Sequence, residues 1–158
     1  MTEQDRIFMR EAIALSLSGM KNGDGGPFGC IIVKNGVVVG RGNNRVTSTN
    51  DPTAHAEIIA IRDACRHLSS FQLDGCIVYT SCEPCPMCLG AIYWARLDRI
   101  VYACTRKDAA DIDFDDDFLY KELVAPMAER RIPIVPLLRQ EGLVAFKEWK
   151  NRRDKTVY

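Results

Sequence analysis

The 158-residue sequence carries no excess of charge of either sign, and it contains only two histidines. Its 21 Lys and Arg residues balance 21 Asp and Glu residues, which argues against a dedicated nucleic-acid-binding surface, because such surfaces carry a basic excess. Two histidines cannot supply a metal site built from three histidine ligands. Long apolar runs are also missing, so the sequence predicts no segment that spans a bilayer and no membrane partner.

A secretion signal and a disulfide framework are not expected either. The first residues, Thr2 to Asp5, lack the basic stretch followed by an apolar stretch that marks a signal peptide. Seven cysteines, an odd number, in a chain without such a signal favour metal or redox chemistry. We therefore expect a cytoplasmic protein. Neither a repeat nor a linker interrupts residues 1–158, which predicts a single domain.

Apolar patterning predicts an alternation of helices and strands. Runs of β-forming residues predict strands at 28–34, 37–39, 76–81, 99–104 and 132–136. Periodicity and start signals predict helices at 4–20, 54–68, 86–95, 118–130 and 142–152. Residues 43–50 and 108–117 are expected to be loops. This order predicts an α/β fold, a three-layer α/β/α domain with a central mixed sheet of about five strands.

A tight hairpin is predicted at Asn35-Gly36. This pair separates two apolar runs, and both positions of the two-residue turn require positive φ, which Asn and Gly tolerate best. The first two strands should therefore be antiparallel neighbours.

His55, Cys85 and Cys88 form a candidate zinc site. Each lies at the start of a predicted helix, where the helix dipole favours thiolate over thiol. Imidazole and thiolate are preferred zinc ligands, and three protein ligands leave a fourth position for water, as in catalytic zinc sites. The competing interpretations are a thioredoxin-like redox pair for the two cysteines and a structural role for the histidine.

Glu57 is the candidate proton carrier beside that site. Residues two apart on an ideal helix point to nearly opposite sides, so His55 and Glu57 reach one site only if His55 is the helix cap. Pro52 and Thr53, just upstream, favour a helix that starts there. Cys82 is expected next to the site rather than as a fourth ligand, because four thiolate or imidazole ligands would close the site to water.

Three stretches of sequence carry a resemblance to a known family. They are NDPTAHAE at 50–57, TSCEPCPMCLGAIYW at 80–94 and FDDDF at 114–118. The first two contain the H-x-E and P-C-x-x-C signature of the cytidine deaminase superfamily. From Gly25 to Tyr158 the chain resembles the small zinc-type bacterial guanine deaminases of that superfamily. The first two stretches are shared in part with tRNA adenosine deaminases, whereas the third is typical of the guanine branch.

The resemblance implies a reaction as well as a cofactor. It implies one Zn²⁺ per subunit, held by His55, Cys85 and Cys88, and hydrolytic deamination of guanine to xanthine and ammonia in purine catabolism. Glu57 would take a proton from a zinc-activated water and pass it to a ring nitrogen and then to the leaving ammonia. The substrate would be a small purine base, and no nucleic-acid partner is expected.

The resemblance also implies contacts with the base. The amide of Asn44 would read purine donors and acceptors, and Phe28 would form a face of the pocket, although a core aromatic residue there is an equal alternative. Asp116 would accept from N1–H and the amine of guanine; its alternative is a solvated acidic loop. Backbone N–H groups of Ala56 and Cys85 would bind the base or an oxyanion.

The C-terminal segment has a charge opposite to that of the acidic loop. Residues 139–158 carry a net charge of +3 and residues 108–122 a net charge of −6, so the two could pack together within one chain or between chains. The resemblance implies a homodimer whose segment from about 139 to 158 is swapped, with Tyr158, together with Trp149, covering the partner's pocket. A frayed terminus is the alternative.

Three other functions stay open on the sequence alone. A guanosine deaminase would share the metal motifs and a similar Phe-Asp-Asp loop. A tRNA adenosine deaminase would be expected to carry a basic surface, which the zero net charge disfavours. A structural zinc-binding module would not be an enzyme at all, and it would normally complete its site with four protein ligands.

Overall fold

The computed structural model describes residues 1–157, and it separates into two compact units. The first unit runs from Met1 to Asp116 and the second begins at Asp117. The predicted candidate residues for the metal and for proton transfer all lie in the first unit. Among the described residues, no helix is both long enough and apolar enough to pass through a membrane.

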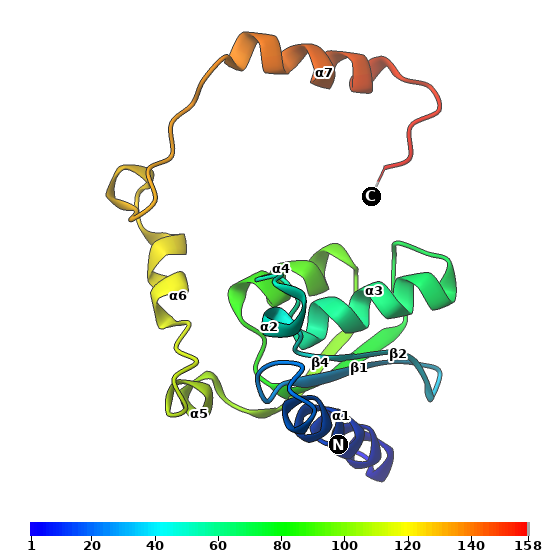
Figure 1. Cartoon of the computed structure of the whole chain (residues 1–158). Helices are drawn as coiled ribbons and strands as arrows, with labels where there is room; N and C mark the ends of the chain where they lie inside the picture. The colour runs from blue at the N-terminus through cyan, green and yellow to red at the C-terminus, as the bar shows by residue number, and fades with distance from the viewer. Residues whose placement is uncertain (158) are drawn as a thin grey trace. The chain divides into compact units, whose positions relative to one another are not determined.

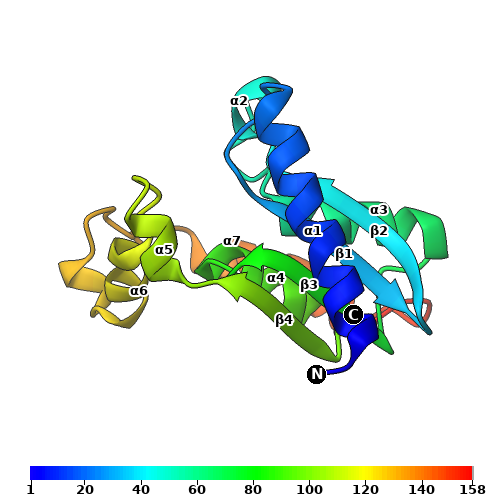
Figure 2. The ribbon, with the colours of Figure 1, turned by 90° about the horizontal axis from the view of Figure 1, so that it is seen from below.

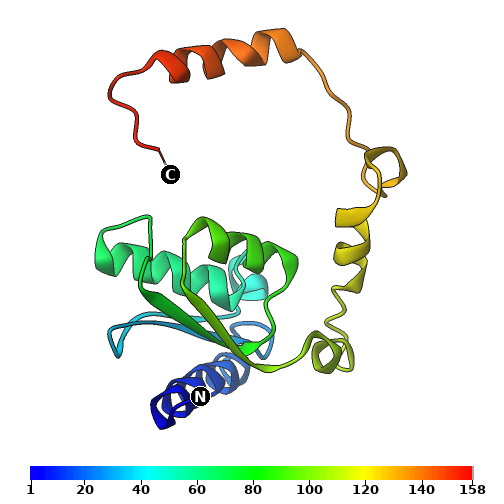
Figure 3. The same ribbon diagram turned by 180° about the vertical axis from the view of Figure 1, so that it is seen from behind.

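A four-stranded mixed sheet forms the centre of the first unit. Its strands are β1 (Gly29–Lys34), β2 (Val37–Asn43), β3 (Cys76–Cys82) and β4 (Arg99–Cys104), in the order β2-β1-β3-β4. Strand β1 is antiparallel to both β2 and β3, whereas β3 and β4 are parallel. Helix α1 (Glu3–Lys21) covers one face, and α3 (Ala56–Leu68) and α4 (Pro86–Trp94) cover the other (Figures 1 and 3). The predicted three-layer α/β/α fold is confirmed.

Two apolar layers hold the helices on the sheet. Figure 2 shows α1 lying across the sheet. The apolar layer between this helix and the strands contains Phe8, Ala12, Ile31, Val33, Tyr79 and Val101. The layer under α3 and α4 contains Cys30, Ile32, Val39, Ala56, Ala60, Ala64, Leu73, Cys76, Val78, Ile92 and Ala95. Small residues dominate the α3 side of this second layer, which lets that helix approach the strands closely.

Two glycines on β2 allow this close approach. A Cβ atom at Gly42 would come within 2.2 Å of the Ala56 carbonyl oxygen, and one at Gly40 within 2.5 Å of the Ala60 carbonyl oxygen. Any side chain at either position would push α3 away from the sheet. The first turn of α3, which carries the candidate site residues, is therefore seated directly on the backbone of β2.

The hairpin prediction is confirmed in its backbone angles. Asn35 has φ 52° and Gly36 has φ 77°, the positive values that the two-residue turn requires. This turn connects β1 to β2 and fixes their register, in which Lys34 is opposite Val37.

The fifth strand, predicted at 132–136, is not present, and the sheet has four strands. Pro133 and Pro136 interrupt that run, and proline has no N–H group to donate to a ladder. Pro126 likewise ends α6 (Asp117–Val124) before the predicted limit at 130, and the short helix η1 (Met127–Glu129) follows.

Two segments predicted as loops contain short helices. Helix α2 (Val46–Thr49) lies within 43–50, and α5 (Arg106–Ala110) begins just before 108–117. Helix α5 is started by a capping box, in which the side chains and backbone N–H groups of Thr105 and Asp108 bond reciprocally. Helix α5 leads directly into the acidic residues that follow it, from 111 to 117.

The second unit consists of α6, η1 and α7 (Arg139–Asn151) joined by irregular segments. None of these helices contains a buried residue in the described part of the chain. Large apolar side chains are therefore exposed along its length, among them Val124 (86%), Leu137 (83%) and Phe146 (73%).

Candidate metal centre and pocket

The first residues of α3 and α4 bring the candidate ligands together. His55 is the N-cap of α3, with extended backbone angles (φ −69°, ψ 156°), and Cys85 is the N-cap of α4 (φ −65°, ψ 167°). The prediction that His55 caps its helix is confirmed. Because His55 precedes regular helical geometry, its ring and the Glu57 side chain reach the same region.

The separations among the three ligand atoms fit a tetrahedral zinc ion. The sulfur atoms of Cys85 and Cys88 each lie 3.6 Å from Nδ1 of His55, and all three atoms lie within 4.8 Å of one another. With Zn–S of about 2.3 Å and Zn–N of about 2.0–2.1 Å, tetrahedral angles give an N–S separation of about 3.6 Å. His55, Cys85 and Cys88 therefore fit zinc with one coordination position left over.

The cysteines of this cluster have unequal proton affinities. A hydrogen bond from the Cys88 thiol, and then one from His55, lowers the pKa of Cys85 to about 4. The same bond, together with burial, raises the pKa of Cys88, and the bond to Cys85 raises the pKa of His55. A zinc ion would meet one thiolate, that of Cys85, and the Cys88 thiol would have to lose its proton to bind the metal.

Cys82 lies near the cluster but is not part of it. Its sulfur is 3.5 Å from the backbone oxygen of Thr105, to which it donates, and burial raises the pKa of its thiol to about 12. It lines the pocket and is not among the clustered ligand atoms, which agrees with the expectation that it lies next to the site and is not a fourth ligand.

Glu57 lies buried beside the ligands. Its Oε2 accepts from the Cys88 sulfur at 3.4 Å, and its Oε1 accepts from the Thr80 hydroxyl at 3.3 Å. Burial raises the pKa of Glu57 above the usual value of 4.5. A carboxyl group with a raised pKa in a dry site both takes up and releases a proton readily, which is what a general acid–base requires.

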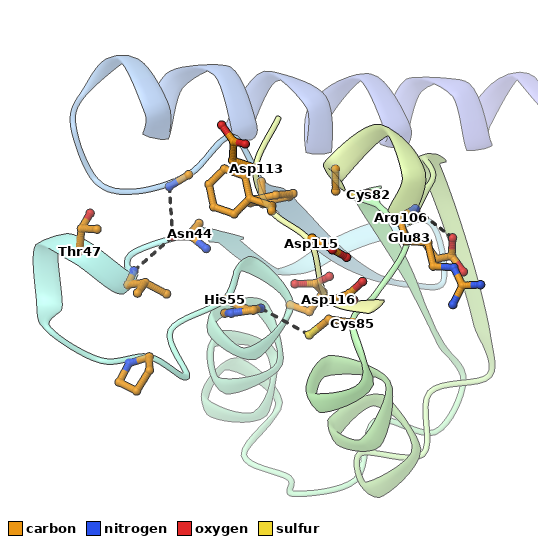
Figure 4. Close-up of a pocket in the computed structure, with 17 residues that line it drawn as sticks. Asn44, Thr47, His55, Cys82, Glu83, Cys85, Arg106, Asp113, Asp115 and Asp116 are labelled. Carbon is orange, nitrogen blue, oxygen red and sulfur yellow. Dashed lines mark hydrogen bonds between the residues drawn. The ribbon is translucent and has the colours of Figure 1, made fainter. Parts of the chain in front are cut away.

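A pocket of about 420 Å³ opens above these groups (Figure 4). His55, Glu57 and Cys85 line it from the first turns of α3 and α4, and Asn44 and Asp116 line it from two separate loops. Its size lies within the range of small-molecule sites. The structure thus brings most of the predicted residues into one cavity.

Asn44 is held by its carboxamide oxygen. The backbone N–H groups of Gly26 and Val46 each donate to Oδ1 at 3.2 Å (Figure 4). A Cβ atom at Gly25 would lie 2.3 Å from this same oxygen, so the loop fits closely around it. The NH₂ group of Asn44 is consequently the part that can serve a ligand, and it serves as a donor.

Phe28 lines the pocket together with Phe114, the first residue of the 114–118 stretch, to which no contact with the base was assigned from the sequence. The rings of Phe28 and Phe114 meet edge to face, with centroids 4.9 Å apart and an interplanar angle of 87°. A Cβ atom at Gly26 would lie 2.9 Å from the Phe114 ring. The one signal in the sequence that Phe114 has a role in the pocket is that it is an aromatic residue between aspartates.

The acidic loop contributes Asp113, Asp115 and Asp116 to the lining (Figure 4). Burial, followed by the nearby Cys85 charge, raises the pKa of Asp116 above its usual 3.8. The alternative of a fully solvated loop therefore does not describe Asp116, although neighbouring Asp111 is exposed.

Glu83 and Arg106 also line the pocket, and both were missed as site residues. The carboxylate of Glu83 accepts the backbone N–H of Arg106 at 3.1 Å, and the Glu83 N–H donates to the Cys104 carbonyl at 2.8 Å. Glu83 thereby connects the segment before the cysteine motif to the first residue of α5. No local sequence signal indicates this long-range contact.

Three residues predicted to contact the base or to cover the pocket are not among the described residues that line it. Ala56 is fully buried at the first position of α3 and is not among the described residues that line the pocket, although first-turn N–H groups lack intrahelical acceptors. Trp149 lies on α7 in the second unit and is partly exposed. Tyr158 lies outside the described residues. Roles for these residues stay predictions.

Comparison with known proteins connects the sequence that builds this site to a family of zinc-binding deaminases. The family described as "Cytidine and deoxycytidylate deaminase zinc-binding region" matches residues 2–104. Guanine deaminase of Bacillus subtilis strain 168 is 52% identical over 151 residues, 96% of this chain and 97% of that protein. The tRNA-specific adenosine deaminase of Aquifex aeolicus is 42% identical over 81 residues, 51% of this chain and 54% of its own.

One of these likenesses extends to a solved structure. An X-ray structure of guanine deaminase from Bacillus subtilis matches with a TM-score of 0.94 at 52% identity, covering 97% of this chain and 98% of that one. The agreement therefore covers the arrangement of the chain as well as its motifs.

Proposed function

The chain belongs to the cytidine and deoxycytidylate deaminase zinc-binding family, and from this premise we propose that it hydrolyses guanine to xanthine and ammonia. It is a zinc-dependent hydrolase with a deaminase domain. The observation that carries the proposal is Glu57, which is buried with its carboxylate 3.4 Å from a ligand sulfur and lines a pocket of about 420 Å³. A structural zinc module has no need of such a carboxylate.

The residues of the site divide the work of the reaction. Zinc, when bound by His55, Cys85 and Cys88, supplies a Lewis acid that lowers the pKa of a water ligand. Glu57 accepts one proton from the attacking water and delivers it to a ring nitrogen, and it then moves the second proton of that water from the new C2 hydroxyl to the departing amine. The water oxygen becomes bonded to C2, and the C2–amine bond breaks.

The pocket offers groups that complement the edges of guanine. The Asn44 NH₂ group donates, which suits the O6 or N7 acceptors of the base. Asp116 accepts, which suits N1–H and the exocyclic amine. Phe28 and Phe114 supply the apolar surface for the ring faces. Cytosine and adenine present a different arrangement of donors at the corresponding edge.

A substrate panel tests this choice. Zinc-loaded protein is incubated with guanine, guanosine, adenine and cytosine, and ammonia is measured together with the product. We expect guanine to have the highest kcat/KM and xanthine to appear in equal amount with ammonia. Greater activity on guanosine than on guanine would overturn the choice of substrate and would leave the reaction class intact.

We further propose that the working form is a homodimer in which the segment from about 139 to 158 is exchanged. The support is that α6, η1 and α7 contain no buried residue among those described, although they carry Val124, Leu137 and Phe146. So much exposed apolar surface is typical of an interaction surface. The net charge of +3 at 139–158 also complements that of −6 at 108–122.

Light scattering of the full-length protein tests the dimer, for which we expect twice the 17.8 kDa chain mass. A variant without Val157 and Tyr158 tests the terminus as a cover for the pocket. It should lose activity while keeping its unfolding temperature, and unchanged activity would contradict that role. We infer a setting in purine catabolism in the cytoplasm, where a reducing environment keeps thiolate ligands available.

A further inference from the structure

Strand β3 places one hydroxyl group in the apolar layer beneath α3 and α4. Cys76, Val78, Thr80 and Cys82 alternate onto the same face of this strand, and the first two belong to the apolar layer. Thr80 is 1% exposed. A hydroxyl group buried among apolar side chains is costly unless it has a hydrogen-bond partner.

The partner of this hydroxyl is the candidate proton carrier. Thr80 Oγ1 donates to Oε1 of Glu57 at 3.3 Å, while Oε2 of the same carboxylate lies 3.4 Å from the Cys88 sulfur. The carboxyl group is thus held between the sheet on one side and a metal ligand on the other. The O–O separation is long, as expected where hydrogen bonds of acid–base groups tighten only with substrate in place.

Building on the proposed function, we propose that Thr80 is a positioning residue that fixes the Glu57 carboxylate for proton transfer. Thr80 touches Glu57 and does not line the pocket, so it acts through that residue. A glutamate side chain has several rotatable bonds, and anchoring one oxygen leaves the other to carry the proton. Small displacements of a catalytic group are costly, because proton transfer requires close alignment.

A purely structural role makes a different prediction for the same position. Valine has nearly the shape of threonine and lacks the hydroxyl, so it would fill the apolar layer at least as well. If Thr80 only fills space, Thr80→Val leaves catalysis unchanged. If it positions Glu57, valine lowers kcat and serine, which keeps the hydroxyl, largely restores it.

The test compares Thr80→Val and Thr80→Ser in zinc-loaded protein, with bound zinc measured in each. We expect Thr80→Val to lower kcat for guanine roughly tenfold, a part of the 10²–10⁴-fold that a placed acid–base group supplies, with KM unchanged within about twofold. Thr80→Ser should stay within about threefold of the parent kcat. Should valine prevent folding, Thr80→Ala is interpreted in the same way.

Ser81→Ala is the matched control, because Ser81 is the next buried hydroxyl on β3 and accepts from the Gly29 N–H at 3.0 Å. Its loss should lower the unfolding temperature without lowering kcat. A second readout needs no turnover: the infrared carboxyl band of Glu57, identified by difference from Glu57→Gln, should shift in Thr80→Val and not in Thr80→Ser.

The outcomes separate the two proposals. If the parent protein does not deaminate guanine, the proposed function fails, and the infrared band still decides whether Thr80 binds Glu57. If guanine is deaminated and Thr80→Val keeps full kcat, or if Thr80→Ser loses as much as Thr80→Val, the positioning role is wrong.

Discussion

His55, Glu57, Cys85 and Cys88, here called the metal corner, lie on the first turns of two helices that pack on the sheet. Phe114, Asp115 and Asp116, the outer wall, lie in a loop beyond the last strand. The metal corner is held by backbone geometry and close packing, whereas the outer wall is held by a few long-range contacts. From this difference we propose that the reaction type depends on the metal corner, and that the outer wall contributes to the choice of base.

The largest effect is expected from Glu57→Gln in the metal corner. Glutamine has the same shape but cannot accept and return a proton, so kcat should fall about 10²–10⁴-fold while zinc stays bound. Ammonia release and zinc content measure the two quantities. Glu129→Gln, an exposed substitution on η1, serves as the control. If Glu57→Gln keeps its activity within about twofold of the parent, the acid–base role of this region is wrong.

The next largest effect is expected for zinc affinity in Cys88→Ser. Removing a buried ligand should weaken zinc binding by more than about 100-fold, because changes in the outer shell alone already cost about 10–100-fold. Competition with a chromophoric chelator measures this. Cys65→Ser, which removes a half-buried cysteine outside the cluster, should bind zinc normally. Equal zinc affinity in the two variants would show that the metal lies elsewhere.

A smaller effect is expected in the outer wall from Phe114→Ala. Stacking of a base on an aromatic side chain is worth about 1–3 kcal/mol, so KM for guanine should rise about tenfold, with a smaller change in kcat and none in zinc content. Steady-state kinetics with guanine separate the two parameters. The control is Phe71→Ala, an exposed aromatic residue that does not line the pocket. A loss confined to kcat would contradict the assignment of Phe114 to substrate binding.

The smallest effect is a pH dependence carried by Asp116. Burial raises its pKa above the usual 3.8, and binding of guanine donors requires the ionised form. As the pH falls, Asp116 becomes protonated sooner than an ordinary aspartate, so the rise in KM should begin at a higher pH than an aspartate of ordinary pKa would give. Asp116→Asn should raise KM a few-fold (about fivefold) and remove this acid rise. An unchanged acid rise in that variant would assign it to another group.

The two halves of the metal corner could be predicted from the sequence because the determinants of each half are local, whereas the family resemblance implied that the halves meet across 30 positions. The H-x-E and P-C-x-x-C spacings place their side chains within one helical turn, and the proline-rich lead-in of each helix favours a cap at His55 and Cys85. The Asn35-Gly36 turn was predictable for the same reason, since two adjacent residues determine its backbone angles.

Features that depend on distant residues were not predictable. Thr80 meets Glu57 across 23 positions of sequence, and the Phe114 ring contacts the ring of Phe28, which lies in a distant part of the sequence. The run at 132–136 has the composition of a strand, but its two prolines remove the N–H donors that a ladder needs. Local sequence patterns therefore indicated the type of reaction, but they did not predict how the outer wall packs around the pocket.

The most direct test of the account is deamination of guanine by zinc-loaded protein in ¹⁸O-labelled water, followed by mass analysis of the purine product. We expect one ammonia for each xanthine, one ¹⁸O atom in each newly formed xanthine, and product formation about 10²–10⁴-fold slower in Glu57→Gln with zinc still bound. Absence of ammonia from the zinc-loaded parent protein, or xanthine without the label, would contradict a hydrolytic guanine deaminase built on this metal corner.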